Sequence, residues 1–140
     1  MNETNSKQIN WDAITCLVVD DDKFSRTFMK TALYQIGVKN TREASTTSEA
    51  VEILRNYKIN VELLDQQMPD QSGLELAKKI KSGEVADKDL PVIMVTIDTK
   101  ENTVMEAKSI GIHEYLVKPI SPLALKKRLC TAFGIKENKS

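Results

Sequence analysis

The sequence predicts an α/β fold in which five strands alternate with five helices, a doubly wound (βα)5 arrangement around a five-stranded parallel sheet. Short apolar runs recur along the chain and are separated by longer segments whose apolar residues have helical spacing. Residues that cap or end helices stand at the borders of these longer segments. Strands that alternate with helices in this way form a parallel sheet covered by helices on both faces, with right-handed crossovers.

The strands are predicted from their apolar composition. The run at residues 14–19 is continuous, apolar and β-branched, which is typical of a strand buried on both faces. Pro91 is tolerated in a later run because it lies at the start of that strand. The remaining strands are expected at residues 39–44, 59–65, 90–96 and 114–117.

The helices are predicted from their capping residues. Thr46 and Ser72 are each followed three residues later by a glutamate, which is the pattern of a capping box. Ser121 precedes Pro122, a suitable first helical residue. The helices are expected from Asp22 to Gly37, from Thr46 onward, from Ser72 to about Lys81, from Asp98 or Thr99 to Gly111, and from Ser121 to about Phe133.

The overall composition indicates one compact domain. We expect a flexible tail at residues 1–12, the domain at residues 13–134 and a second tail at residues 135–140. The 20 acidic and 20 basic side chains cancel, so no overall field favours nucleic acid or anionic lipid. No apolar run could span a bilayer and no signal peptide precedes the domain, so we expect a cytoplasmic protein without a membrane partner. Cys16 and Cys130 are better read as buried free thiols than as a disulfide.

Polar side chains follow four of the predicted strands. Asp20 and Asp21 follow the first strand, and Asp65 ends the third. Thr96 ends the fourth strand and Lys118 follows the fifth. Because the carboxyl ends of parallel strands face one crevice in an open α/β sheet, we expect these side chains to meet there.

This combination of residues suits phosphoryl transfer to a carboxylate. Crowded carboxylates repel one another, and a set of oxygen ligands without paired His or Cys favours Mg2+ or Mn2+. A carboxylate can act as a nucleophile towards phosphorus. The lysine and the metal would neutralise the charge that develops, and the hydroxyl of Thr96 can donate to phosphoryl oxygens. Asp22 is assigned instead to the N-cap of the following helix. All three aspartates could be read simply as N-cap residues, but one helix needs only one cap.

The ordered motifs resemble those of CheY-like response-regulator receiver domains. The resemblance covers residues 13–134 and implies a flavodoxin-like sheet with strand order 2-1-3-4-5. The motifs are Leu-Val-Val-Asp-Asp-Asp at 17–22, Leu-Leu-Asp-Gln-Gln-Met-Pro at 63–69, Ser-Gly at 72–73, Pro-Val-Ile-Met-Val-Thr at 91–96 and Tyr-Leu-Val-Lys-Pro at 115–119.

The resemblance also implies a role for each residue of the site. Asp65 would be the phosphoacceptor of a Mg2+ site (Mn2+ being an alternative ion). Asp21 would ligate the metal directly, Asp20 largely through water, and Gln67 through its backbone carbonyl. Lys118 would pair with the phosphoryl group, through a cis peptide bond to the proline that follows it.

Thr96 and Tyr115 would form the conformational switch of such a domain. The hydroxyl would move to the phosphate and the ring would follow inward. The helix that ends at Gly111, the last strand and the last helix would then form the surface read by a downstream protein target.

The function that follows is a stand-alone receiver of a two-component system or phosphorelay, and not an enzyme that turns over external substrates. A sensor histidine kinase or phosphotransfer protein would donate the phosphoryl group from a phosphohistidine. Neither nucleic acid nor a membrane is expected as a partner.

Glu62 and Ile97 depart from the family pattern and keep other functions open. Glu62 stands in the predicted strand that ends at Asp65, where the family usually has an aliphatic residue. A buried carboxylate is costly unless it is protonated, paired or pointing to an open edge. Ile97 replaces a small residue, and we expect its bulk to slow phosphoryl entry and hydrolysis at Asp65. The departures favour one alternative, a degenerate receiver that binds partners without phosphorylation. A Mg2+-dependent phosphohydrolase ranks lower, because no second acid/base residue is well placed for it.

Overall fold

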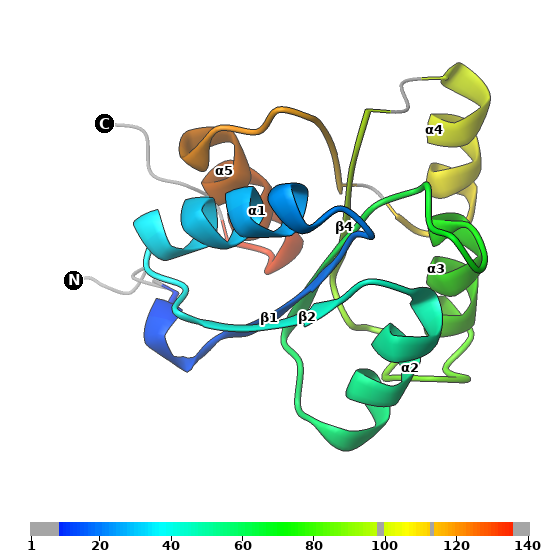
Figure 1. The fold of residues 1–140 in the computed structure, drawn as a ribbon, viewed down its shortest axis with the longest axis horizontal. Helices are drawn as coiled ribbons and strands as arrows, with labels where there is room; N and C mark the ends of the chain where they lie inside the picture. Colours follow the sequence, from blue (N-terminus) through cyan, green and yellow to red (C-terminus); the bar gives the residue numbers. More distant parts are fainter. Residues whose placement is uncertain (1–8, 98–99, 113, 136–140) are drawn as a thin grey trace.

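The computed structural model describes residues 9–97, 100–112 and 114–135 (Figure 1). The five strands are parallel and lie in the order β2-β1-β3-β4-β5, which confirms the predicted doubly wound fold and strand order. The strands are β1 (Thr15–Val19), β2 (Asn40–Ala44), β3 (Val61–Leu64), β4 (Val92–Thr96) and β5 (Glu114–Val117). The helices are α1 (Lys23–Gln35), α2 (Thr47–Asn56), α3 (Gly73–Lys81), α4 (Glu101–Ser109) and α5 (Pro122–Ala132), preceded by a short 3₁₀ helix, η2 (Trp11–Ala13).

The helices form a layer on each face of the sheet. Helices α1 and α5 lie together on one side in Figure 1, and α2, α3 and α4 lie on the other. Met29 and Leu33 of α1 and Leu125 of α5 pack with Val18 and Leu63 of the central strands in one apolar cluster. On the opposite face, the apolar cluster of the sheet is completed by residues of the other three helices: Ala50, Leu74, Leu76, Ala77, Ile80 and Ala107.

Strand β1 is apolar from Cys16 onward because helices cover both faces of the sheet. Residues Cys16 to Val19 of β1 alternate between the two clusters, and all four are fully buried. Such continuous burial is what a parallel sheet between two helical layers requires. Trp11 extends the α1/α5 cluster from η2 and packs against the turn at Gly37.

The predicted helix caps are confirmed, except that the capping box at Thr46 is only half formed. Asp22 accepts a hydrogen bond from the backbone N–H of Phe24 at 3.0 Å, and Ser72 forms both halves of its capping box with Glu75. Thr46 accepts from the N–H of Glu49, but the Glu49 carboxylate turns back to the N–H and hydroxyl of Ser45. Ser121 caps α5 by accepting from the N–H of Ala124.

Some element boundaries differ from the predicted ones. Strand β4 begins at Val92 because Pro91 has no N–H, although its carbonyl still accepts a hydrogen bond from Glu62 of β3 at 3.0 Å. The expected start of the fourth helix at Asp98 or Thr99 lies outside the described residues. In the described part, α4 begins at Glu101 with Lys100 as its N-cap residue.

Two cysteines and one glutamate are buried away from the acidic strand ends. Cys16 and Cys130 are buried thiols that form no disulfide, as predicted, and burial raises the pKa of Cys16 well above its usual range. Glu62 is also fully buried, and within the described residues neither carboxylate oxygen has a hydrogen-bond partner. Burial raises the pKa of Glu62 from 4.5 to about 8, so the side chain is protonated at neutral pH.

None of the helices in the described ranges has the length and hydropathy that crossing a membrane requires.

Candidate functional site

Four strands deliver polar side chains to the carboxyl edge of the sheet. The backbone ladder continues one residue past the strands, because the N–H of Asp65 donates to the carbonyl of Val19 at 3.0 Å. In the same way the N–H of Lys118 donates to the carbonyl of Thr96 at 3.0 Å. These bonds fix the Cα positions of the strand-end residues relative to one another, so the predicted convergence is a property of the sheet register.

Three carboxylates meet at this edge. One carboxylate oxygen each from Asp20, Asp21 and Asp65 lie within 4.8 Å of one another. Asp20 is fully buried and Asp65 is 7% exposed, whereas Asp21 is exposed to solvent. The cluster therefore opens to solvent on the Asp21 side and is closed on the side of the sheet.

Lys118 bridges two of the carboxylates. Its ammonium nitrogen lies 2.5 Å from Oδ2 of Asp20 and 3.2 Å from Oδ2 of Asp65. Burial alone would lower the pKa of Lys118, but the hydrogen bond to Asp20 and the charge of Asp65 raise it above its usual value. Lys118 is therefore charged, and it offsets part of the repulsion among the aspartates. The Lys118–Pro119 peptide bond is cis, as the family resemblance implies.

The turn after β1 orients Asp20. The backbone N–H of Asp22 donates to Oδ1 of Asp20 at 2.9 Å, while Oδ2 of Asp20 receives Lys118. Both carboxylate oxygens of Asp20 are thus engaged by the protein. Asp22 itself turns away and caps α1, so the structure divides the aspartate triplet between the acidic cluster and the helix cap.

The loop after β3 is held close to its own strand. The side-chain oxygen of Gln66 accepts a hydrogen bond from the N–H of Leu74 at 2.9 Å, and its carbonyl accepts from the N–H of Gly73 at 2.8 Å. The N–H of Gln67 makes a longer contact of 3.5 Å with Oδ1 of Asp65. The loop therefore folds back over the carboxylate and keeps the backbone of Gln67 next to it.

The residues present suit a hard divalent cation. The candidate metal ligands of the cluster are all carboxylate oxygens, and their spacing of at most 4.8 Å allows them to share one ion. Oxygen ligands without thiolate or imidazole favour Mg2+ or Mn2+ over Zn2+. The exposed position of Asp21 leaves the ion side of the cluster open to water or to a phosphoryl group.

Thr96 and Tyr115 lie on the same face of the sheet. Thr96 is fully buried at the end of β4. Tyr115 of β5 is paired in register with Met94, which lies two residues before Thr96 in β4. The ring of Tyr115 packs partly buried against the apolar cluster of the α2/α3/α4 layer. The two residues thus belong to adjacent strands and to one packed layer.

An apolar groove runs beside Lys118. Its volume is about 340 Å³, and it is lined chiefly by Phe24 and Phe28 of α1, by Ile97 and by Pro119. Phe24 is 86% exposed and Ile97 is 67% exposed, so large apolar side chains stand uncovered at the rim of the acidic cluster. Sequence patterns did not reveal this groove, because its walls come from three segments that are distant along the chain.

Sequence reasoning also missed Gln66, Gly73, Arg26 and Asp70, whose contacts hold the loops of the site. From the sequence, Gly73 is recognised only within the Ser-Gly motif at 72–73, yet its small size permits the close return of the loop. The contacts of the other three join different loops or elements. The sequence shows only that these polar side chains lie near predicted metal ligands along the chain. It does not show which group each side chain contacts.

Comparisons with known proteins agree with this geometry. A sequence model described as the response regulator receiver domain matches residues 16–130. A chemotaxis protein CheY homolog of Campylobacter jejuni is 37% identical over 119 residues, covering 84% of this chain and 91% of the relative. The chemotaxis protein CheY-3 of Vibrio cholerae is 34% identical over 117 residues, covering 84% and 89%.

Solved structures show the same fold. A CheY-like response regulator receiver domain protein from Methanospirillum hungatei superposes with a TM-score of 0.78 at 25% identity, covering 88% of this chain and 95% of the other. The CheX–CheY–BeF3–Mg2+ complex of Borrelia burgdorferi contains a chain with a TM-score of 0.78 at 26% identity, covering 86% and 89%. The match to the family model, the sequence relatives and the fold agree, and this chain belongs to the response regulator receiver domain family.

Proposed function

We propose that the protein is a phosphorylation switch in which Asp65 accepts a phosphoryl group from the phosphohistidine of a sensor kinase or phosphotransfer protein. The observation that carries the proposal is the meeting of the Asp20, Asp21 and Asp65 carboxylates within 4.8 Å, with the Lys118 ammonium 3.2 Å from Asp65. A buried carboxylate beside a fixed cation and an open acidic rim is suited to in-line attack on phosphorus.

The transfer exchanges one bond to phosphorus for another. A carboxylate oxygen of Asp65 forms the new P–O bond while the P–N bond of the donor phosphohistidine breaks. The imidazole nitrogen leaves with the bonding electron pair and is neutral or takes a proton from water. The product is an acyl phosphate on Asp65, whose extra negative charge faces Lys118.

A divalent ion would supply charge neutralisation and would orient the phosphoryl oxygens when bound. Asp21 and Asp65 would hold Mg2+ directly, Asp20 would act largely through water, and Gln67 would contribute its backbone carbonyl. Mn2+ suits the same oxygen ligands. Lys118 and the hydroxyl of Thr96 would donate hydrogen bonds to the remaining phosphoryl oxygens.

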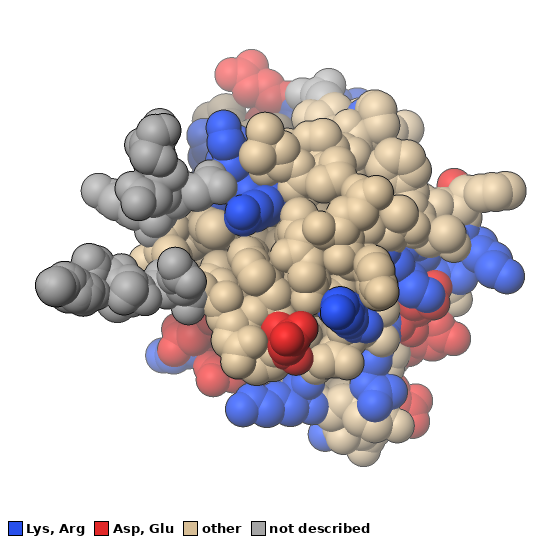
Figure 2. Space-filling model, turned by 90° about the vertical axis from the view of Figure 1, so that its left-hand side faces the viewer, with Lys and Arg blue, Asp and Glu red and all other residues tan. Residues whose placement is uncertain are grey.

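The surface beside the site suits contact with a protein donor. A phosphohistidine must approach Asp65 to bonding distance, so the donor has to touch the rim that Phe24, Phe28 and Ile97 form. Figure 2 faces the side of the molecule that carries α1 and α5, and most of the surface in view is uncharged. The outward side chains of α1 contribute to this uncharged surface, because Phe24, Phe28 and Tyr34 are exposed.

Phosphorylation would be read on the surface of α4, β5 and α5. Thr96 would follow the phosphoryl group and Tyr115 would move with it, which would change the packing of the layer that the ring now contacts. Met105, Val117 and Leu123 are exposed apolar side chains on these three elements and would contact a downstream protein. A shift from mostly off to mostly on needs differential binding of about 5 kcal/mol.

The proposal is tested by labelling with acetyl phosphate, with and without Mg2+. We expect one saturable, acid-stable and alkali-labile phosphoryl group, located on Asp65 by borohydride reduction and peptide mapping. Asp65→Asn should abolish the label. Asp22→Asn is the matched control, because an asparagine still caps α1 and the charge removed is outside the acidic cluster.

The same experiment separates the alternative functions. Continuous release of phosphate from small phosphate esters, without a stable label, would indicate a phosphohydrolase. Absence of any label and of any response to beryllofluoride with Mg2+ would contradict the switch and favour a phosphorylation-independent binding module.

A further inference from the structure

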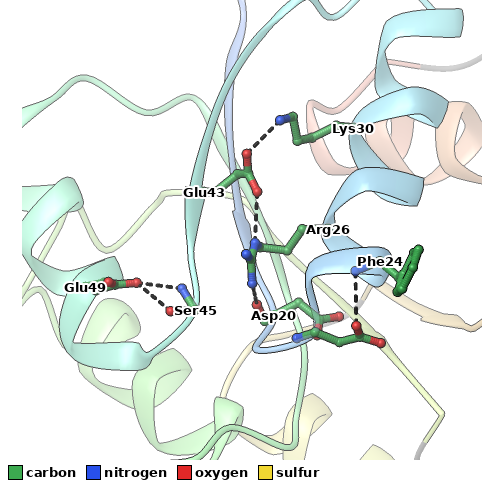
Figure 3. Close-up of polar contacts among 8 residues, drawn as sticks. Asp20, Phe24, Arg26, Lys30, Glu43, Ser45 and Glu49 are labelled. Atoms are coloured by element: carbon green, nitrogen blue, oxygen red, sulfur yellow. Dashed lines mark hydrogen bonds and ion pairs between the residues drawn. The ribbon is translucent and has the colours of Figure 1, made fainter.

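The backbone of Asp20 is held from both sides by neighbouring elements. Its N–H donates to the carbonyl of Ala44 in β2 at 3.1 Å. Its carbonyl accepts a hydrogen bond from a terminal nitrogen of the Arg26 guanidinium at 2.8 Å, as Figure 3 shows. The peptide between Asp20 and Asp21 is therefore oriented by Arg26, which is not itself part of the acidic cluster.

Arg26 is in turn fixed by Glu43 of β2. Its Nε lies 2.9 Å from one Glu43 oxygen, and Lys30 of α1 lies 2.6 Å from the other (Figure 3). The hydrogen bonds from Lys30 and Arg26 lower the pKa of Glu43, so this anchor is ionised at neutral pH. A single guanidinium thus ties the turn after β1 to the edge strand β2.

Asp70 ties the other acid-bearing loop to the start of α2. One carboxylate oxygen accepts from the N–H of Thr47 at 3.0 Å. The other accepts from the Thr47 hydroxyl at 2.8 Å and from the N–H and hydroxyl of Ser48 at 3.0 and 3.1 Å. Although burial acts to raise it, these hydrogen bonds hold the pKa of Asp70 well below its usual range.

Both anchors end on one short stretch of chain, residues 43–48, which we name the β2–α2 segment. It carries Glu43 and Ala44, which hold the turn with Asp20 and Asp21, and Thr47 and Ser48, which hold the loop between Asp65 and α3. The segment is braced by the residue that follows it, because the Glu49 carboxylate accepts from the N–H and hydroxyl of Ser45 at 2.7 and 2.9 Å (Figure 3).

We propose that Arg26 and Asp70 are positioning residues that anchor the two acid-bearing loops to the β2–α2 segment and so preset the spacing of the metal ligands. This inference rests on the proposed Mg2+ site. The three carboxylates repel one another when no metal ion is bound, because Lys118 offsets their charge only in part, and anchors outside the cluster oppose the separation of the two loops. The cation then binds carboxylates that are already in place and loses less affinity to ordering.

The experiment compares Arg26→Gln and Asp70→Asn with two matched controls. Lys30→Gln removes the other cation bound to Glu43 while the hydrogen bond to Asp20 remains. Thr46→Ala removes the side-chain cap of α2 while the hydrogen bonds of Asp70 remain. Mg2+ affinity is measured by isothermal titration calorimetry on each folded variant, and the Mg2+ dependence of labelling by acetyl phosphate is measured in parallel.

We expect Arg26→Gln and Asp70→Asn each to raise the Mg2+ dissociation constant about 10-fold, as the loss of a residue that orients metal ligands does. The extent of labelling should recover when Mg2+ is raised in the same proportion. Lys30→Gln and Thr46→Ala should bind Mg2+ as the wild type does. Arg26→Lys should restore only part of the affinity, because one ammonium does not reproduce the fork that reaches both Asp20 and Glu43.

A purely structural role gives a different result. In that case the midpoint of urea unfolding would fall while the Mg2+ affinity of the folded protein stayed unchanged, and the inference would be overturned. Equal weakening by the control variants would overturn it too. Failure of the phosphorylation proposal is seen separately, because calorimetry reads Mg2+ binding whether or not Asp65 of the wild type is labelled.

Discussion

Gly73 at the start of α3 packs directly against the backbone of Asp65. A Cβ placed on Gly73 would lie 2.2 Å from the Asp65 carbonyl oxygen and 3.0 Å from the Cα of Gln66. These neighbours are backbone atoms and cannot turn aside as a side chain could. The absence of a side chain at residue 73 is therefore a condition for the loop that returns over Asp65.

Gly73→Ala is expected to open this loop. The added methyl must push α3 away from Asp65, which should lower the free energy of unfolding by about 1 to 3 kcal/mol. It should also weaken Mg2+ binding, since the backbone of Gln67 moves with the loop. Urea unfolding and calorimetric Mg2+ titration measure the two effects.

Gly83→Ala is the control for this variant. Gly83 has a φ of +83° and nothing within 4 Å of its Cβ position, so alanine there meets backbone strain without a clash. It should lose stability and keep the wild-type Mg2+ affinity. Normal Mg2+ binding by Gly73→Ala would contradict the assigned role of the close contact.

Ile97→Ala is expected to speed both labelling and dephosphorylation of Asp65 several-fold. The isoleucine side chain stands at the rim of the site, in the groove that Lys118 also lines, and its removal widens the approach for acetyl phosphate and for water. Rates follow from the time courses of label gain and loss. Leu123→Ala, which trims an equally exposed side chain on α5, should leave both rates unchanged. Unchanged rates in Ile97→Ala would remove the idea that its bulk limits access.

The sequence predicts the parts of the site that depend on strand ends. Asp20, Asp65 and Lys118 could be placed together because a parallel sheet brings the carboxyl ends of its strands to one edge. That inference needs only the order and the type of the elements, and both follow from apolar spacing and capping residues. The register of the sheet then fixes the relative positions of the strand ends, because the N–H of Asp65 donates a hydrogen bond to the carbonyl of Val19.

The contacts that hold the loops were beyond the reach of sequence patterns. Arg26 meets Glu43 across 17 residues, and Asp70 meets Thr47 across 23 residues. Each pairing depends on the path of a turn and on the choice of rotamer, which periodicity does not specify. Glu62 shows the same limit, because the sequence indicated a costly carboxylate but not whether it was protonated, paired or at an open edge.

Lys118→Met is expected to uncouple metal binding from phosphorylation. Without the ammonium group, the charge at Asp20 and Asp65 is unbalanced, and Mg2+ should bind more tightly because it no longer competes with a fixed cation. Labelling should slow by on the order of 10²-fold, since a preorganised charge for the phosphoryl oxygens is lost. Lys127→Met, an exposed lysine of α5, serves as the control for charge alone. Labelling at the wild-type rate would contradict the role given to Lys118.

The buried Glu62 makes stability depend on pH in a predictable direction. Its pKa is about 8 in the folded protein against an ordinary value of 4.5, so the folded state holds a proton that the unfolded state releases. The contribution of the buried Glu62 to stability is therefore complete below pH 4.5 and is lost progressively as the pH rises from 4.5 to the folded pKa of about 8. The loss amounts to roughly 3 kcal/mol at pH 7 and roughly 5 kcal/mol above pH 9, at about 1.4 kcal/mol per pH unit.

Glu62→Leu is expected to remove this pH dependence and to stabilise the protein most at high pH. A leucine fills the site between the central strands without an ionisable group, so the urea midpoint should exceed that of the wild type by a margin that grows from pH 5 to pH 9. Glu62→Gln should flatten the profile as well, but at a lower stability than leucine because its amide is buried without a partner. Glu52→Gln on the exposed side of α2 should follow the wild-type profile. Parallel profiles for the wild type and Glu62→Leu would show that the carboxylate at residue 62 ionises without cost to the fold.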